Sequence, residues 1–103
     1  MIDSCAEKVV HVVSTAVMEE SVVKAIKSAG CNGYTVFDVR GDGEAGFQDG
    51  QLEGESNVMF MIVVSNDIYE ALLDNLNVYI KKGHHMMVFS SNVDVMTPTK
   101  FSK

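Results

Sequence analysis

The sequence has little of what several functional classes require. It contains no Trp, a single Pro and one arginine, Arg40, and its 14 acidic residues outnumber the basic ones, so the formal net charge is -6. Binding to a nucleic-acid backbone depends on clustered Lys and Arg. We therefore expect no nucleic-acid partner. Only two cysteines are present, Cys5 and Cys31, and their spacing is that of neither a metal site nor a redox motif. We expect both to be reduced thiols.

Long hydrophobic runs are also absent. The longest apolar run, 58-VMFMIVV-64, is far too short to cross a bilayer, and the N-terminal residues do not have the charged-then-apolar pattern of a secretory signal. We expect a cytoplasmic protein with no direct membrane insertion. No motif places a Ser-His-Asp or Cys-His grouping, so we do not expect an enzyme.

The chain does have the size and composition of one globular domain. It is 103 residues long and 47% apolar, which one hydrophobic core can hold together. We expect a single domain over residues 1–103 with a flexible C-terminal tail at 97–103.

Four segments have the short apolar or alternating pattern of strands. The segment 34-YTVFDV-39 alternates between two faces, and 57-NVMFMIVVS-65 is apolar almost throughout, which is typical of a central strand. The four predicted strands are 8–14, 34–39, 57–65 and 84–96.

Two segments have helical spacing and end at a glycine. The first covers 17–30 and ends at Gly30, and the second covers 67–82 and ends at Gly83. Acidic residues lie early and lysines late in the second helix, as the helix dipole favours. The positions expected to face inward are Val17, Val22, Val23, Ile26 and Ala29 in the first helix and Ile68, Leu72, Leu76, Val78 and Tyr79 in the second.

The order of these elements is βαββαβ. It predicts an α+β, ferredoxin-like fold, in which both helices cover one face of an antiparallel four-stranded sheet. The other face is then bare and partly apolar, with Met59, Met61, Met86 and Met87 expected in the core or at a subunit interface. A bare apolar face implies self-association, so we expect a closed homo-oligomer, most simply a homotrimer.

The segment 39-VRGDGEAGFQDGQLEGES-56 holds five of the eight glycines and five acidic residues. Within it, 41-GDGEAG-46 satisfies the G-x-G-x-x-G dinucleotide pattern, but the residues that follow have no helical period, which that motif requires. A hairpin between two neighbouring strands needs only a few residues. The extra length predicts a functional loop at about 40–56 that becomes ordered on binding.

Around this loop the sequence resembles the P-II signalling superfamily. The segment 30-GCNGYTVFDVRGDG-43 is similar to the family's pattern of a helix-ending Gly, a G-x-T at the start of the second strand and V-(K/R)-G-x-G at the base of a long T-loop. The segment 58-VMFMIVVSNDI-68 is similar to its third strand and second-helix start. The resemblance covers most of residues 8–96.

The resemblance implies a trimer that binds an adenine nucleotide in clefts between subunits and regulates a protein partner, such as a membrane transporter, through the T-loop. Arg40 would face the phosphate, and the backbone of Gly41 and Gly43 would approach it. The ligand-binding positions implied for this chain are Thr35, Arg40, Gly41, Asp42, Gly43, Val64, His85 and Phe89.

The chain departs from the family pattern in its second phosphate loop. The family's T-G-x-x-G-D-G-K is replaced by Lys82, Gly83, His84 and His85, and no Arg follows position 40. Such a site is similar to divergent P-II-like proteins associated with bicarbonate transport and carboxysomes. It implies an adenine nucleotide ligand of the AMP or ADP type, with bicarbonate as a candidate second ligand beside it, and no tightly bound cofactor.

Two other functions stay open at this stage. A CutA-like trimeric metal-binding protein would use His84 and His85, although neighbouring residues on a regular strand point to opposite faces. A structural interaction protein without a ligand is the third possibility. No metal site follows from the sequence pattern, because three or four convergent ligands are needed.

Overall fold

The computed structural model of the chain describes residues 5–41 and 56–97. Asp42 and Gly43, most of the predicted loop at 40–56, and all of the predicted tail except residue 97 lie outside them. Within the described residues, no helix is long and apolar enough to cross a bilayer.

The elements follow the predicted order, with one short 3-10 turn added. The strands are β1 (Cys5–Thr15), β2 (Thr35–Val39), β3 (Asn57–Val64) and β4 (Met86–Val95). The helices are α1 (Glu19–Ser28) and α2 (Asn66–Lys81), and the 3-10 turn η1 covers Ala16–Met18.

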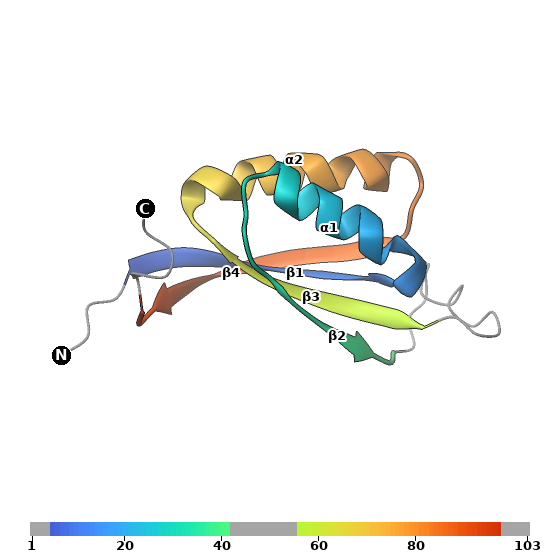
Figure 1. Ribbon diagram of the computed structural model, residues 1–103, viewed down its shortest axis with the longest axis horizontal. Coiled ribbons are helices and arrows are strands. Elements are labelled where there is room, and N and C mark those ends of the chain that lie inside the picture. The colour runs from blue at the N-terminus through green and yellow to red at the C-terminus, as the bar shows by residue number, and fades with distance from the viewer. Residues whose placement is uncertain (1–4, 42–55, 98–103) are drawn as a thin grey trace.

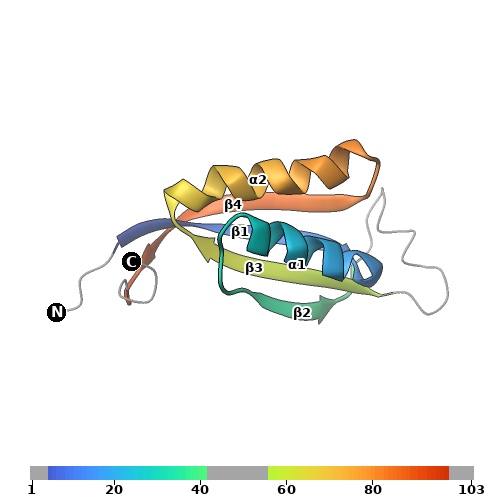
Figure 2. The ribbon, with the colours of Figure 1, turned by 45° about the horizontal axis from the view of Figure 1, so that its top comes forward.

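The four strands form one antiparallel sheet in the order β2-β3-β1-β4. Both helices lie on the same face of it and run side by side in opposite directions (Figures 1 and 2). The predicted ferredoxin-like fold is therefore confirmed. β3 and β1 are the central strands, which is the position that the apolar run of β3 predicts.

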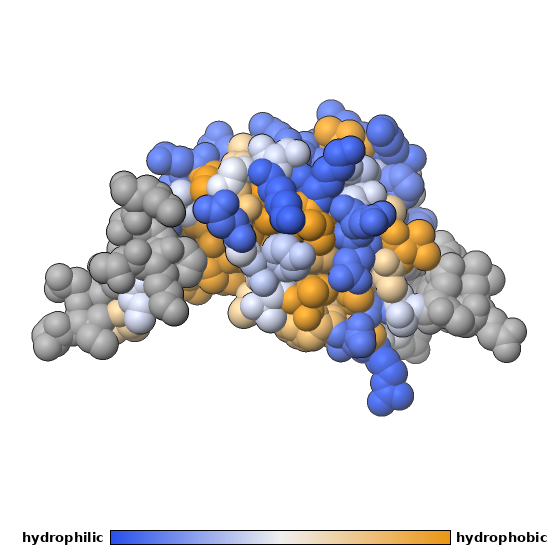
Figure 3. Space-filling view, viewed as in Figure 1, coloured by the Kyte–Doolittle hydropathy of each residue, from blue (hydrophilic) through white to orange (hydrophobic). Residues whose placement is uncertain are grey.

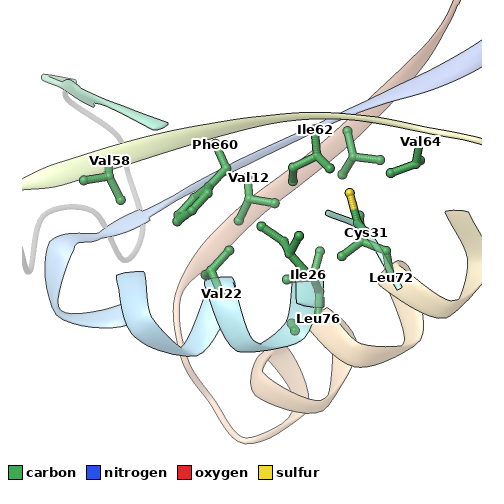
Figure 4. Close-up of a cluster of buried hydrophobic side chains, with 12 residues drawn as sticks. Val12, Val22, Ile26, Cys31, Val58, Phe60, Ile62, Val64, Leu72 and Leu76 are labelled. Atoms are coloured by element: carbon green, nitrogen blue, oxygen red, sulfur yellow. The ribbon is translucent and has the colours of Figure 1, made fainter. Parts of the chain in front are cut away.

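The core lies between the sheet and the two helices. Alternate side chains of β3 point toward the helices, where Val22 and Ile26 of α1 meet Leu72 and Leu76 of α2 (Figure 4). Because side chains alternate along a strand, each central strand gives every second residue to this core. The contributions of the two central strands that are almost completely buried are Val10, Val12, Val58, Phe60, Ile62 and Val64.

Both helices end in the same glycine motif. Gly30 and Gly83 have φ values of 96° and 98°, a left-handed conformation that costs glycine little. The N–H of Cys31 donates to the carbonyl of Ile26 at 3.2 Å, and the N–H of His84 donates to that of Tyr79 at 3.1 Å. These are the six-to-one bonds of a Schellman motif, which caps the free carbonyls of a helix end.

Two expected inward positions are wrong. Val17 is 73% exposed because it lies in η1, where Met18 is buried in its place. Val78 is 50% exposed, since at 100° per residue it lies about 200° around α2 from the buried Leu76. The last strand also begins at Met86, two residues later than predicted, because His84 is still bonded to the end of α2.

The sheet face turned away from the helices is here called the open face. It carries four large apolar side chains, which come from β2, β3 and β4 and are 37% to 48% exposed: Phe37, Met61, Met87 and Phe89. Nothing in the described chain covers them, as the sequence predicts for a bare face. Figure 3 views the molecule from the side, with the helices above and this face turned downward, and hydrophobic atoms are visible below the polar surface of the helices.

Candidate functional site

A hollow in the described chain lies at one edge of β3. β2 begins at Thr35, which pairs with Met61, so β3 has no neighbouring strand on that side from Ile62 onward. A hollow of about 540 Å³ occupies this position and is here called the edge pocket. It is lined by Gly30, Cys31, Asn32, Gly33, Tyr34, Thr35, Met61, Val63, Val64, Ser65 and Ile68.

One wall of the edge pocket is the turn between α1 and β2. The glycine motif at Gly30 turns the chain out of α1, and the buried thiol of Cys31 donates to the carbonyl of Gly33 at 3.2 Å. The ring of Tyr34 lies against Phe60 of the core, with 5.5 Å between ring centroids. The wall is thus held by a helix cap, a side-chain hydrogen bond and a core contact, which favours a preformed hollow.

Thr35 and Val64 are the two predicted ligand-binding residues that line the edge pocket. Thr35 is exposed at the first position of β2. Val64 is only 2% exposed and belongs to the core on the helix side, whereas its neighbour Val63 lies on the open face. Of the predicted residues, these two are therefore brought together.

Arg40 and Gly41 lie at the other end of β2. They follow Val39, which pairs with Asn57 at the start of β3, and both are exposed. Arg40 comes five positions after Thr35 along extended chain, a span of about 17 Å at 3.3 Å per residue. In one chain, Thr35 and Arg40 therefore lie at opposite ends of β2.

His85 and Phe89 belong to the opposite edge strand. His85 precedes β4 at the same end of the sheet as Arg40, because Met86 pairs with Ser14 near the end of β1. Phe89 lies on the open face, where its ring stacks on that of His11 with 4.7 Å between centroids and 13° between planes. The six predicted positions that the structure describes are thus spread over three places, and Asp42 and Gly43 lie outside the described residues.

The alternative metal site at His84 and His85 gains no further ligand from the described part of the chain. The ring of His84 lies against Tyr79 at 6.1 Å between centroids. Within residues 5–41 and 56–97, no three His, Cys, Asp or Glu side chains come together in a group that could hold a metal ion.

Sequence reasoning did not single out most of the edge pocket. Cys31 and Tyr34 were visible as neighbours of the G-x-T turn, and they could have been included on that ground. Met61, Val63 and Ile68 could not, because their place beside Thr35 follows from the β2–β3 register and from the start of α2.

Comparisons with known proteins agree on the fold. The chain is similar to CPII, a nitrogen regulatory PII-like protein from Thiomonas intermedia K12. In the structure of CPII bound to ADP and bicarbonate, the sequence identity is 23% and the TM-score is 0.84, over 99% of this chain and 100% of that chain. In a structure of the same protein bound to ADP, AMP and acetate, the sequence identity is 22% and the TM-score is 0.83, over 99% of this chain and 100% of that chain. No curated protein matches the chain.

A PII-like signaling protein from Thermus thermophilus is 26% identical with a TM-score of 0.79, over 98% of this chain and 100% of that chain. The family model described as nitrogen regulatory protein P-II matches residues 7–100, which include every element after β1 and nearly all of β1. The chain therefore belongs to the P-II family.

Proposed function

We propose that this protein is a P-II-like regulator that binds an adenine nucleotide of the AMP or ADP type in clefts between the subunits of a homotrimer. Bicarbonate is the candidate second ligand, and the regulated target is a protein, such as a membrane transporter, contacted by the loop at 40–56 in the cytoplasm. Family membership supports the regulatory role. The adenine nucleotides and bicarbonate bound by the Thiomonas protein support the ligand class.

The edge pocket carries this proposal. Its volume of about 540 Å³ lies within the range of small-molecule sites. Its lining is mainly apolar, and β3 beyond Met61 has no strand neighbour on the pocket side. Free backbone N–H and C=O groups beside apolar walls suit a flat heterocycle that has both donors and acceptors. The hydroxyl of Thr35, which lines the pocket, would contact such a base.

The charge of the ligand supports an intersubunit site. None of the described residues that line the edge pocket carries a charge, although a nucleotide phosphate needs cationic or N–H partners. Arg40 lies about 17 Å away along β2. A second copy that places its own Arg40 beside the first copy's Thr35 would join the two halves of the site.

The open face supports assembly of identical chains. Phe37, Met87 and Phe89 remain largely exposed on it in a single chain, and such a contiguous apolar surface is unusual on a monomer. Closed symmetry lets each copy cover its neighbour's face. A homotrimer would thereby bury the open face and bring Arg40 to the seam.

The loop would transmit the ligand signal. Arg40 and Gly41 lie where the described chain leaves β2 for this segment, so a ligand that contacts them changes the population of loop shapes. The five acidic residues of the loop, Asp42, Glu44, Asp49, Glu53 and Glu55, predict a basic or cation-bearing partner surface.

Titration calorimetry tests the proposal with AMP, ADP, ATP, bicarbonate and Zn²⁺. We expect AMP or ADP to bind. Arg40→Ala should weaken that binding about tenfold or more, because it removes a charge-assisted hydrogen bond. Lys24→Ala is the matched control, because Lys24 is an exposed cation on α1 outside the edge pocket. The proposed site would be refuted if no nucleotide gave a heat of binding, or if Arg40→Ala and Lys24→Ala weakened nucleotide binding equally. A heat of binding for Zn²⁺ alone would indicate a metal-binding protein instead.

A further inference from the structure

One aromatic ring lines the edge pocket. It belongs to Tyr34, and the other described residues of the lining carry no ring. Tyr34 is 38% exposed, although most of its side chain is apolar. An aromatic side chain provides a large and flat contact surface. The wall of the edge pocket therefore includes one flat apolar surface that the described chain leaves partly uncovered.

The ring of Tyr34 is held in place by the core. It lies against Phe60, with 5.5 Å between ring centroids and 53° between ring planes, and Phe60 is completely buried. A tilted contact of this kind is a favoured arrangement of two aromatic rings. The turn before Tyr34 is fixed as well, because the thiol of Cys31 donates to the carbonyl of Gly33. A ligand that packs on the ring therefore finds a surface that is already ordered, which lowers the entropy cost of binding.

The surroundings of Tyr34 suit the base of a nucleotide better than its phosphate. No described residue that lines the edge pocket is charged. Thr35, the next residue, adds a hydroxyl to the lining, and Ile68 of α2 adds an aliphatic side chain. A nucleobase has a π face and a polar edge, so it needs a flat apolar contact together with a few hydrogen-bonding groups. The ring of Tyr34 would supply the flat contact, and Thr35 and the unpaired edge of β3 would supply the hydrogen bonds.

We propose that Tyr34 is a specificity-determining residue whose ring stacks on the nucleobase and favours a purine over a pyrimidine, an inference that rests on the proposed function. The two fused rings of a purine present more area to an aromatic side chain than the single ring of a pyrimidine does, and the attraction grows with the number of atoms in contact. A leucine at this position would also be apolar but would lack the flat face. Loss of one stack between a base and an aromatic ring weakens binding about tenfold or more.

The other two tyrosines lie elsewhere and serve as controls. The hydroxyl of Tyr69 shares a hydrogen bond of 2.8 Å with that of Ser90, and the ring of Tyr79 lies against His84 near the end of α2. Neither tyrosine lines the edge pocket. The chain has three tyrosines and no tryptophan. A Tyr69→Phe/Tyr79→Phe double variant therefore leaves Tyr34 as the only source of tyrosine emission.

The test compares ADP with UDP by titration calorimetry, because these two nucleotides differ only in the base. We expect the wild-type protein to bind ADP more tightly than UDP. Tyr34→Phe keeps the ring and should preserve this preference, whereas Tyr34→Leu should lower the ADP affinity about tenfold and the UDP affinity less. Tyr79→Leu is the matched control and should keep the wild-type preference. In the double variant that retains only Tyr34, ADP should quench the tyrosine emission.

The outcomes separate this inference from the proposed function. A Tyr34→Leu protein that folds, by circular dichroism, and binds ADP as the wild type does refutes the stacking role but leaves the proposed function intact. So does equal weakening of ADP and UDP binding in that variant, which would mean that the ring only supports the pocket wall. The emission test leaves Tyr34 unchanged, so an emission that saturating ADP does not alter refutes the stacking role even if Tyr34→Leu fails to fold. A wild-type protein that binds no nucleotide contradicts both.

Discussion

Replacement of Gly30 by alanine tests how the wall of the edge pocket is built. Gly30 has a φ of 96°, and a Cβ atom added there would meet no other atom within 4 Å. Steric crowding by the rest of the protein therefore contributes nothing, and the whole cost is the backbone conformation. For an L-residue in the left-handed region that cost is about 1 to 2 kcal/mol.

The expected loss of stability is measurable. A destabilisation of about 1 to 2 kcal/mol lowers the melting temperature of a domain of this size by about 5 to 15 °C. The free energy of unfolding is measured by urea denaturation at one fixed protein concentration, so that assembly affects each variant equally. An unchanged m-value would show that the folded and unfolded surfaces are preserved.

Two other glycines act as controls for Gly30→Ala. Gly33 also has open space for a Cβ but no positive φ, so Gly33→Ala should be neutral or stabilise by about 0.5 kcal/mol. Gly83→Ala carries the same strain at the end of α2, with a φ of 98°. It should destabilise to a similar extent. Equal stability of the Gly30 and Gly33 variants would refute the argument from strain.

Three further changes follow from the packing. Phe60→Ala removes a fully buried ring at the centre of β3. It should lower the free energy of unfolding, measured by denaturation, by about 3 to 5 kcal/mol. A loss no larger than that of a substitution at an exposed position would contradict the assigned core. Asn75→Ala removes the hydrogen bond from Nδ2 to the carbonyl of Ala25 at 3.1 Å. Because that carbonyl also accepts from the N–H of Ala29, we expect a loss of only about 1 kcal/mol. Phe89→Asp puts a carboxylate on the open face and should yield a folded monomer in sedimentation; an unchanged assembly would place the interface elsewhere.

Much of the fold could be predicted from the sequence because the signals are local. The two glycines that end the helices, the alternation in β2 and the apolar run of β3 each act within a few residues. The errors have the same origin. Val17 has helical spacing, but the chain enters α1 through a 3-10 turn. Val78 is apolar although it lies on the outward side of α2, so its residue type does not reveal its exposure.

The site was less predictable because proximity along the chain differs from proximity in space. Thr35 and Arg40 lie in one motif of the sequence, yet a strand is extended, so they occupy opposite ends of β2. In contrast, Thr35 and Met61 are far apart in the chain and adjacent in the sheet. Only the register brings His11 into line with them, and no periodicity within a single strand specifies a register across three partners.

The separation of Thr35 from Arg40 along β2 has a genetic consequence. In the proposed trimer each cleft takes its threonine from one polypeptide and its arginine from the next one around the ring. Two mutant alleles, one defective at Thr35 and the other at Arg40, would each inactivate every cleft when expressed alone. Co-expressed, they would complement each other, because any ring that mixes the two products has one junction where an intact threonine meets an intact arginine.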